Sequence, residues 1–214
     1  KVGLDLNDDI ERVKSIRDAV GDSVKLFVDA NQAWSPKQAI KAINQLRRFD
    51  LELVEQPVKA HDISGLAFVR RNVDVPIMAD ESVHSPYDAI NVIKSEAADL
   101  INIKLMKSGG IRNALKITSI SEAAGVKNIV GCMMEGAISI AAAVHFAASA
   151  RNVIFTDLDS DISLKNTLVR SGMVEYKDGF RILSNYPGLG KLEIAMDELR
   201  HVKTFTEKHA ERSF

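Results

Sequence analysis

Short apolar stretches alternate with longer amphipathic stretches along most of this chain. Each short stretch is rich in β-branched residues and almost continuously apolar, which is typical of strands that a parallel sheet buries on both faces. The six predicted strands are Val24–Asp29, Leu51–Glu55, Pro76–Asp80, Leu100–Lys104, Asn128–Met133 and Val153–Asp157.

The stretches between these strands carry helical patterns. Apolar residues recur on one face over Asp8–Val20, which predicts an amphipathic helix. Ser35 and Ser85 are each followed by proline, the combination of an N-cap and a first helical residue that begins many helices. Further helices are predicted after Gly110 and over Ala137–Ala150.

A regular spacing links the strand ends. Asp29, Glu55, Asp80 and Lys104 lie about 25 residues apart, the length of one strand, one helix and two short loops. Six such units predict the α/β class and a (β/α)8 barrel of the TIM type, incomplete at its N-terminal end. An open doubly wound sheet is the main alternative, but it binds ligands at one switch point rather than at every strand end.

The chain divides into two predicted parts. We expect a barrel domain over residues 1–170 that holds strands two to eight, with strand two reduced to a stub. Residues 171–214 are predicted to contain a hairpin over Val174–Ile182 with an Asp-Gly turn, a return strand, and a charged amphipathic helix over 193–214. A barrel short of strands has two open sheet edges, so we also expect this chain to be part of a longer polypeptide.

Composition narrows the classes of protein. The chain has 214 residues, of which 46% are hydrophobic and 27% are charged, so it can bury one sizeable core. The net charge of −1 predicts neither nucleic acid nor a membrane as a partner. The single cysteine, Cys132, excludes an internal disulfide and a cysteine metal cluster, which leads us to expect a cytoplasmic protein.

Three acidic residues indicate a metal site. The carboxyl ends of barrel strands meet at one mouth, so Asp29, Glu55 and Asp80 would repel one another unless a cation lies between them. Oxygen ligands without His or Cys favour Mg²⁺, with Mn²⁺ as a second possibility. A single acid of this kind is more often a loop start or a helix cap, but three at a matched period favour a metal site.

Lys104 is a candidate general base at the end of the fourth strand. Asn102 lies two residues earlier and therefore points to the same side. A poorly solvated lysine beside a metal should have a pKa lowered from about 10.4 toward neutrality, which would allow it to accept a proton. The alternative is a lysine that reaches solvent or pairs with an acid.

Four segments around these residues resemble the enolase superfamily, in its muconate-lactonizing subgroup. They are Asp29–Gln32, Leu53–Pro57, Ala79–Ser82 and Asn102–Lys104. The resemblance implies Mg²⁺ bound by Asp29, Glu55 and Asp80, with Asn31, Glu81 and Asn102 supporting these ligands. The superfamily pairs a lysine or histidine base with Mg²⁺. Lys1 matches the last lysine of the subgroup's Lys-x-Lys motif, which implies that Lys1 and Lys104 are the two catalytic lysines.

The resemblance implies chemistry at a carbon next to a carboxylate. One lysine would remove the α-proton and the other would stabilise or reprotonate the resulting enediolate. Lysines on opposite faces suit racemisation or epimerisation, but they also permit elimination or cycloisomerisation. N-acylamino acid racemase, o-succinylbenzoate synthase and cycloisomerase activities therefore stay open, and a catalytically inactive barrel fragment is the alternative of another class.

The last predicted strand suggests the substrate. Asp157 and Asp159 alternate, so both can face the mouth and hold an ammonium group, although Asp161 makes a second, overlapping pair. This pattern resembles dipeptide epimerases and implies inversion at the C-terminal residue of a dipeptide such as Ala-Glu. The resemblance also makes Met133 and Glu135 candidate substrate-binding residues, and we expect a homo-oligomer when the polypeptide is full length.

Overall fold

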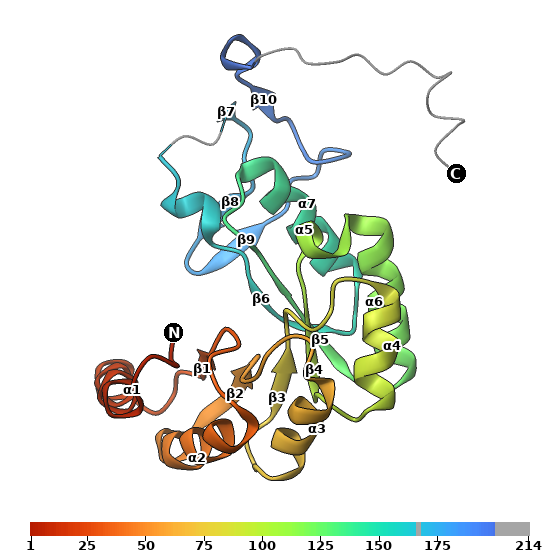
Figure 1. Cartoon of the computed structure of the whole chain (residues 1–214). Helices are drawn as coiled ribbons and strands as arrows, with labels where there is room; N and C mark the ends of the chain where they lie inside the picture. Colours follow the sequence, from red (N-terminus) through yellow and green to blue (C-terminus); the bar gives the residue numbers. More distant parts are fainter. Residues whose placement is uncertain (166–167, 200–214) are drawn as a thin grey trace.

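A single curled sheet organises the molecule. The computed structural model describes residues 1–165 and 168–199. Six parallel strands pair in the order in which they occur along the chain (Figure 1). These strands are β1 (Leu26–Asp29), β2 (Leu51–Glu55), β3 (Ile77–Ala79), β4 (Leu100–Ile103), β5 (Lys127–Gly131) and β6 (Val153–Asp157).

Helices connect the strands and lie along the outside of the sheet (Figure 1). They are α1 (Leu6–Val20), α2 (Pro36–Leu46), α3 (Ile63–Arg71), α4 (Pro86–Lys94), α5 (Leu105–Ser108), α6 (Ile111–Ala123) and α7 (Ala137–Ser149), with short 3₁₀ turns η1 (Arg47–Phe49) and η2 (Ser160–Ser163). This alternation confirms the predicted α/β class and the incomplete (β/α)8 barrel.

The helix starts follow the sequence signals closely. Ser85 caps α4 by accepting a hydrogen bond from the Asp88 amide at 3.2 Å, and Pro86 follows as the first helical residue. α1 begins at Leu6, two residues before the predicted start, because Asp5 caps it by accepting from the amides of Asn7 and Asp8.

The curvature of the sheet is visible in its inner core. Phe27 of β1 and Phe155 of β6 meet edge to face with 5.1 Å between ring centroids, although these two strands are the first and last of the sheet. The sheet therefore curls until its outer strands contact each other through side chains. The inner cluster packed against Phe155 consists of Leu53, Met78, Leu100 and Ile129.

The outer edge of β1 carries the beginning of the chain. The amide of Val2 donates a hydrogen bond to the backbone oxygen of Asp29 at 3.0 Å, and Val2 is buried. Lys1, Val2 and Gly3 therefore lie beside β1, where the stub of a further strand is expected. Within the described residues, β1 and β6 each pair with one other strand of the sheet.

The C-terminal part differs from the sequence prediction. β8 (Glu175–Lys177) and β9 (Phe180–Ile182) form the predicted hairpin around Asp178 and Gly179, both with positive φ, as an Asp-Gly hairpin turn requires. The predicted helix over 193–214 is wrong for residues 193–199. β10 (Glu193–Ile194) instead pairs with β7 (Val169–Ser171), and the 3₁₀ turn η3 (Met196–Glu198) follows. The hydrogen bonds between these two strands stabilise residues 193–194 in an extended conformation rather than a helix. Residues 200–214 lie outside the described residues.

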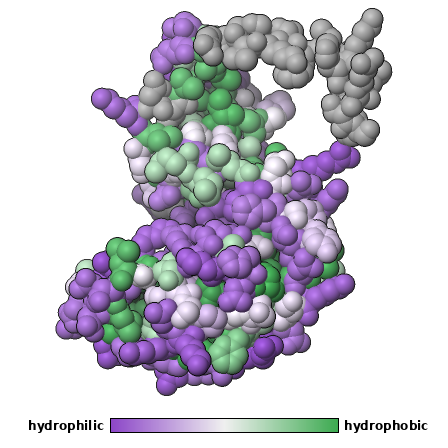
Figure 2. All heavy atoms as spheres, in the orientation of Figure 1, coloured by the Kyte–Doolittle hydropathy of each residue, from purple (hydrophilic) through white to green (hydrophobic). Residues whose placement is uncertain are grey.

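Apolar side chains gather on the surface of this C-terminal part, above a more hydrophilic barrel (Figure 2). Phe180 and Tyr176 of the hairpin are both exposed. None of the described helices has the length and apolar composition that a membrane crossing requires.

Candidate active site

The predicted polar residues lie at one end of the sheet. Asp29 and Glu55 end β1 and β2 and are register partners, whereas Asp80 and Lys104 directly follow β3 and β4. Parallel strands bring their carboxyl ends to the same edge, which explains why residues so far apart in sequence meet. We call this end of the sheet the mouth.

A cavity of about 360 Å³ opens inside the mouth. Its wall joins the first strands of the sheet to the last one, which the curl of the sheet makes possible. The charged and polar residues that line it include Lys1, Asp29, Glu55, Asn102 and Asp157.

Glu55 is the most perturbed carboxyl group of the mouth. It is buried, and Asn102 donates to its Oε1 atom at 2.7 Å. Burial, together with the nearby carboxylates of Asp29 and Asp80, raises the pKa of Glu55 to about 8. Glu55 is therefore a buried acid whose ionised form lacks sufficient positive charge around it.

Asp80 has the opposite electrostatics. It is 2% exposed, and burial would raise its pKa, but the ammonium groups of Lys107 and Lys104 outweigh burial and lower that pKa below its usual range. The Lys104 Nζ atom donates to Asp80 Oδ2 at 2.7 Å, and Lys107 forms an ion pair with the other carboxylate oxygen.

The predicted fall in the pKa of Lys104 does not occur in this arrangement. Burial lowers it, but the ion pair with Asp80 and the charges of Glu55 and Asp29 raise it above its ordinary value. The carboxylates gathered in the same mouth outweigh the effect of desolvation on the pKa of Lys104. Lys104 must leave Asp80 before it can act as a base.

Lys107 is a residue of the mouth that the sequence motifs did not predict. Its ammonium group is buried, contacts Asp80, and donates to the backbone oxygen of Asn102 at 3.2 Å. Burial lowers the pKa of Lys107 below its ordinary value. Its position three residues after Lys104 is the signal that could have identified it, because residues at this spacing share one face of a helical turn such as α5.

Lys1 lies on the other side of the carboxylates. Its Nζ atom forms an ion pair with Asp29 and donates to Asn31 Oδ1 at 2.9 Å. Asn31 in turn donates to Glu81 Oε1 at 3.1 Å. The structure therefore brings Lys1 together with Asn31 and Glu81, two of the residues predicted to support the metal ligands.

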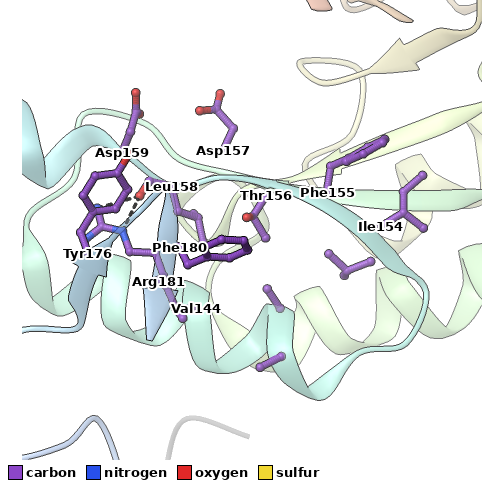
Figure 3. A pocket seen from close by; sticks show the side chains of 14 residues that line it. Val144, Ile154, Phe155, Thr156, Asp157, Leu158, Asp159, Tyr176, Phe180 and Arg181 are labelled. Atoms are coloured by element: carbon purple, nitrogen blue, oxygen red, sulfur yellow. Dashed lines mark hydrogen bonds between the residues drawn. The ribbon is translucent and has the colours of Figure 1, made fainter. Parts of the chain in front are cut away.

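Asp157, which ends β6, and the two acids that follow it separate into two groups. Asp157 and Asp159 project to the same side of the chain, away from Leu158 (Figure 3). Asp161 is instead ion-paired with Arg181 of the hairpin, with Nη1 and Oδ2 separated by 3.2 Å. This contact distinguishes Asp161 from Asp157 and Asp159, whose side chains are exposed.

Asp157 is electrostatically coupled to the mouth. Partial desolvation and the neighbouring Asp159 raise its pKa above the ordinary value, although its side chain remains accessible to solvent. Lys104 and Lys1 both act in the opposite direction on this carboxyl group. Asp157 is therefore close enough for the charges of both lysines to affect its pKa.

The loop after β5 places its two candidates differently. Met133 is 46% exposed and is free to contact a ligand, whereas Glu135 is 3% exposed. The Glu135 carboxylate accepts from the Met133 amide at 2.8 Å and from the Ser139 hydroxyl group. Glu135 stabilises the loop in this conformation, and a direct contact with substrate would require the loop to open.

The carboxylate oxygens of Asp29, Glu55 and Asp80 are the kind of ligand that a hard cation prefers, but in this structure the three side chains do not converge on one point. Among the described residues, no three His, Cys, Asp or Glu side chains are arranged closely enough to hold a metal ion. Asp29 and Asp80 are instead paired with lysines. The Asn102 Oδ1 atom and the Glu81 Oε2 atom are buried here without a hydrogen-bond partner in the described part of the chain.

Fold and mouth together define an α/β-barrel protein with three carboxylates at successive strand ends and a lysine on each side of them. The enolase C-terminal domain-like family matches residues 1–198, and the chain belongs to this family. This match confirms the resemblance read from the four sequence segments.

Relatives of known activity cover most of this chain. It is 48% identical over 192 residues to an L-Ala-D/L-Glu epimerase of Clostridium acetobutylicum, a match that covers 89% of the chain and 53% of that protein. A dipeptide epimerase from Enterococcus faecalis, solved with Mg and the dipeptide L-Leu-L-Tyr, is 50% identical with a TM-score of 0.79, over 82% of this chain and 49% of that one.

The fold is shared more widely than the activity. Muconate cycloisomerase from Pseudomonas fluorescens is 31% identical with a TM-score of 0.87, over 92% of this chain and 54% of that one. This chain therefore spans about half the length of the relatives that it matches. The barrel half alone does not separate epimerases from cycloisomerases, so the activity depends on particular residues.

Proposed function

We propose that the full native polypeptide containing this chain is a Mg²⁺-dependent epimerase that inverts the α-carbon of a dipeptide's C-terminal residue, with Ala-Glu as the expected type. One observation carries the proposal. The carboxylates at the ends of β1, β2 and β3 have Lys1 on one side and Lys104 on the other. The relatives that are dipeptide epimerases support it.

Asp29, Glu55 and Asp80 are the residues that would hold Mg²⁺ or, with the same preference for oxygen, Mn²⁺. When bound, the cation supplies positive charge that stabilises a substrate carboxylate while its α-carbon loses a proton. The raised pKa of Glu55 supports this assignment, because a buried acid repelled by two others is the environment that a cation relieves.

The two lysines would move the proton at the α-carbon. The Nζ atom of one lysine removes it, and the other lysine, as an ammonium group, returns a proton to the opposite face, which inverts the centre. Each lysine first has to separate from its carboxylate partner, Asp29 for Lys1 and Asp80 for Lys104.

The pair formed by Asp157 and Asp159 favours a dipeptide over other substrates. Their carboxylates lie at the mouth end of β6, where they would bind the ammonium group of a dipeptide's first residue. N-acylamino acids and the substrates of cycloisomerases and o-succinylbenzoate synthases offer no ammonium group there. Contacts of Met133 and Glu135 with substrate stay predictions.

A screen in D₂O tests the proposal. The full native polypeptide is incubated with Mg²⁺ and a dipeptide library, and mass spectrometry and NMR follow deuterium at the C-terminal α-carbon. We expect exchange with free dipeptides and at least tenfold less with their N-acetylated forms, because the latter lack the ammonium group. Exchange limited to N-acylated substrates would favour the racemase alternative, and no exchange with either would favour the inactive fragment.

Two further expectations are also untested. The homo-oligomer would be measured by light scattering of the full native polypeptide, and the cytoplasmic location by fractionation of cells. A monomer, or a location outside the cytoplasm, would contradict them without affecting the proposed chemistry.

A further inference from the structure

We propose that Asp9, on helix α1 and outside the mouth, is a positioning residue that fixes Lys1 for proton transfer. The inference rests on the proposed role of Lys1 and extends it to a residue that touches neither substrate nor carboxylate ligands. It assigns a specific purpose to a buried charge that the proposed chemistry does not otherwise use.

Asp9 is fully buried and both its carboxylate oxygens are engaged. Oδ2 accepts from the amide of Gly3 at 2.7 Å, and Oδ1 accepts from Arg12 Nη1 at 2.6 Å. The same Arg12 nitrogen lies 3.4 Å from the backbone oxygen of Lys1. Asp9 and Arg12 therefore connect helix α1 to the backbone on both sides of Val2.

The backbone of the Lys1–Gly3 segment is tied to the barrel on a second side. Besides the contacts with Asp9 and Arg12, the Val2 amide donates to the backbone oxygen of Asp29 at 3.0 Å. Gly3 has a φ of +113°, and a Cβ atom there would come within 2.3 Å of the Ala33 Cβ atom. The segment is thus pressed against the loop after β1, and the Asp9 carboxylate holds it there.

Burial of the Asp9 carboxylate opposes folding through its desolvation, unless hydrogen bonds and nearby positive charge compensate. By holding the backbone of Gly3, Asp9 would fix the position from which Lys1 Nζ contacts Asp29 and Asn31. Displacement of a reacting group by about 1 Å reduces rates roughly 100-fold. Loss of the Asp9 contact should therefore impair Lys1 and leave Lys104 intact.

Epimer-resolved exchange separates these two lysines. In the full native polypeptide, Lys1→Ala should abolish deuterium exchange starting from one epimer of Ala-Glu, which identifies the epimer that Lys1 deprotonates. Asp9→Asn should slow exchange from that same epimer by roughly 10- to 100-fold and change exchange from the other epimer by less than about twofold. Asp8→Asn is the matched control, because Asp8 is exposed on the same helical turn, and it should change neither rate.

The outcomes distinguish this inference from the proposed function. If Lys1→Ala spares both epimers, the role of Lys1 itself is wrong. If Lys1→Ala is selective but Asp9→Asn affects both epimers equally or neither, Asp9 does not position Lys1, and the epimerase proposal stands. If Asp9→Asn fails to fold, Arg12→Ala takes its place, with the same epimer expected to slow and equal slowing of both epimers overturning the inference.

Discussion

Gly131 is a position where one added methyl group should disturb the mouth. It ends β5, and a Cβ atom there would lie 2.7 Å from Asn102 Oδ1, 2.9 Å from Asn102 Nδ2 and 3.1 Å from Lys104 Cε. Asn102 cannot easily move away, because it is 2% exposed and donates to Glu55 at 2.7 Å. Overpacking of this kind reduces stability by about 1–3 kcal/mol. We also expect α-proton exchange to fall roughly 100-fold, because Lys104 would be displaced.

A double-mutant cycle tests the cause. Urea unfolding of the full native polypeptide is compared for Gly131→Ala, Asn102→Ala and the double variant. Asn102→Ala alone should reduce stability by about 1–3 kcal/mol, because it leaves the buried Glu55 Oε1 atom without its hydrogen-bond donor. If the Gly131 methyl group clashes with Asn102, the double variant should be more stable than the sum of the singles predicts, by more than about 0.5 kcal/mol. Additive effects would refute the steric explanation.

Three further predictions concern charge. Lys104→Ala should abolish exchange from one epimer while calorimetry still detects Mg²⁺ binding; unchanged exchange would remove Lys104 as a base. Asp159→Ala should raise KM for dipeptides far more than for N-acylated amino acids, and equal effects would contradict the ammonium assignment. The stability of the metal-free protein should fall as pH rises from 4.5 to about 8, because the folded state binds the Glu55 proton more tightly than the unfolded state. Glu55→Gln should flatten that dependence in urea unfolding, and an unchanged slope would show that Glu55 is not the group responsible.

Sequence patterns predicted the barrel well because its elements are encoded locally. Strands buried on both faces are continuously apolar, as Ile77–Ala79 illustrates, and Ser85 with Pro86 marks a helix start within one residue. The meeting of Asp29 and Glu55 also followed from spacing, since parallel strands of similar length align their ends.

The sequence alone could not predict how the charges of neighbouring side chains in the mouth balance. The pKa of Lys104 depends on how closely Asp80 approaches it, and a motif does not record that distance. Lys107 was not predicted because a lysine on a short helix is usually solvated, and the sequence does not record how closely it approaches Asp80. The error at residues 193–199 arose because β10 forms only by pairing with the distant β7, which a local helical pattern does not reveal.

The most direct test of the two-lysine account is the isotope content of the first product. The full native polypeptide converts protiated L-Ala-L-Glu in D₂O with Mg²⁺, and product is isolated before appreciable reversal. Delivery from a second lysine, on the face opposite the one deprotonated, predicts that the earliest D-Glu product carries deuterium at its α-carbon. Early product that keeps the substrate's own proton would show that one group moves it across both faces, and would contradict the account.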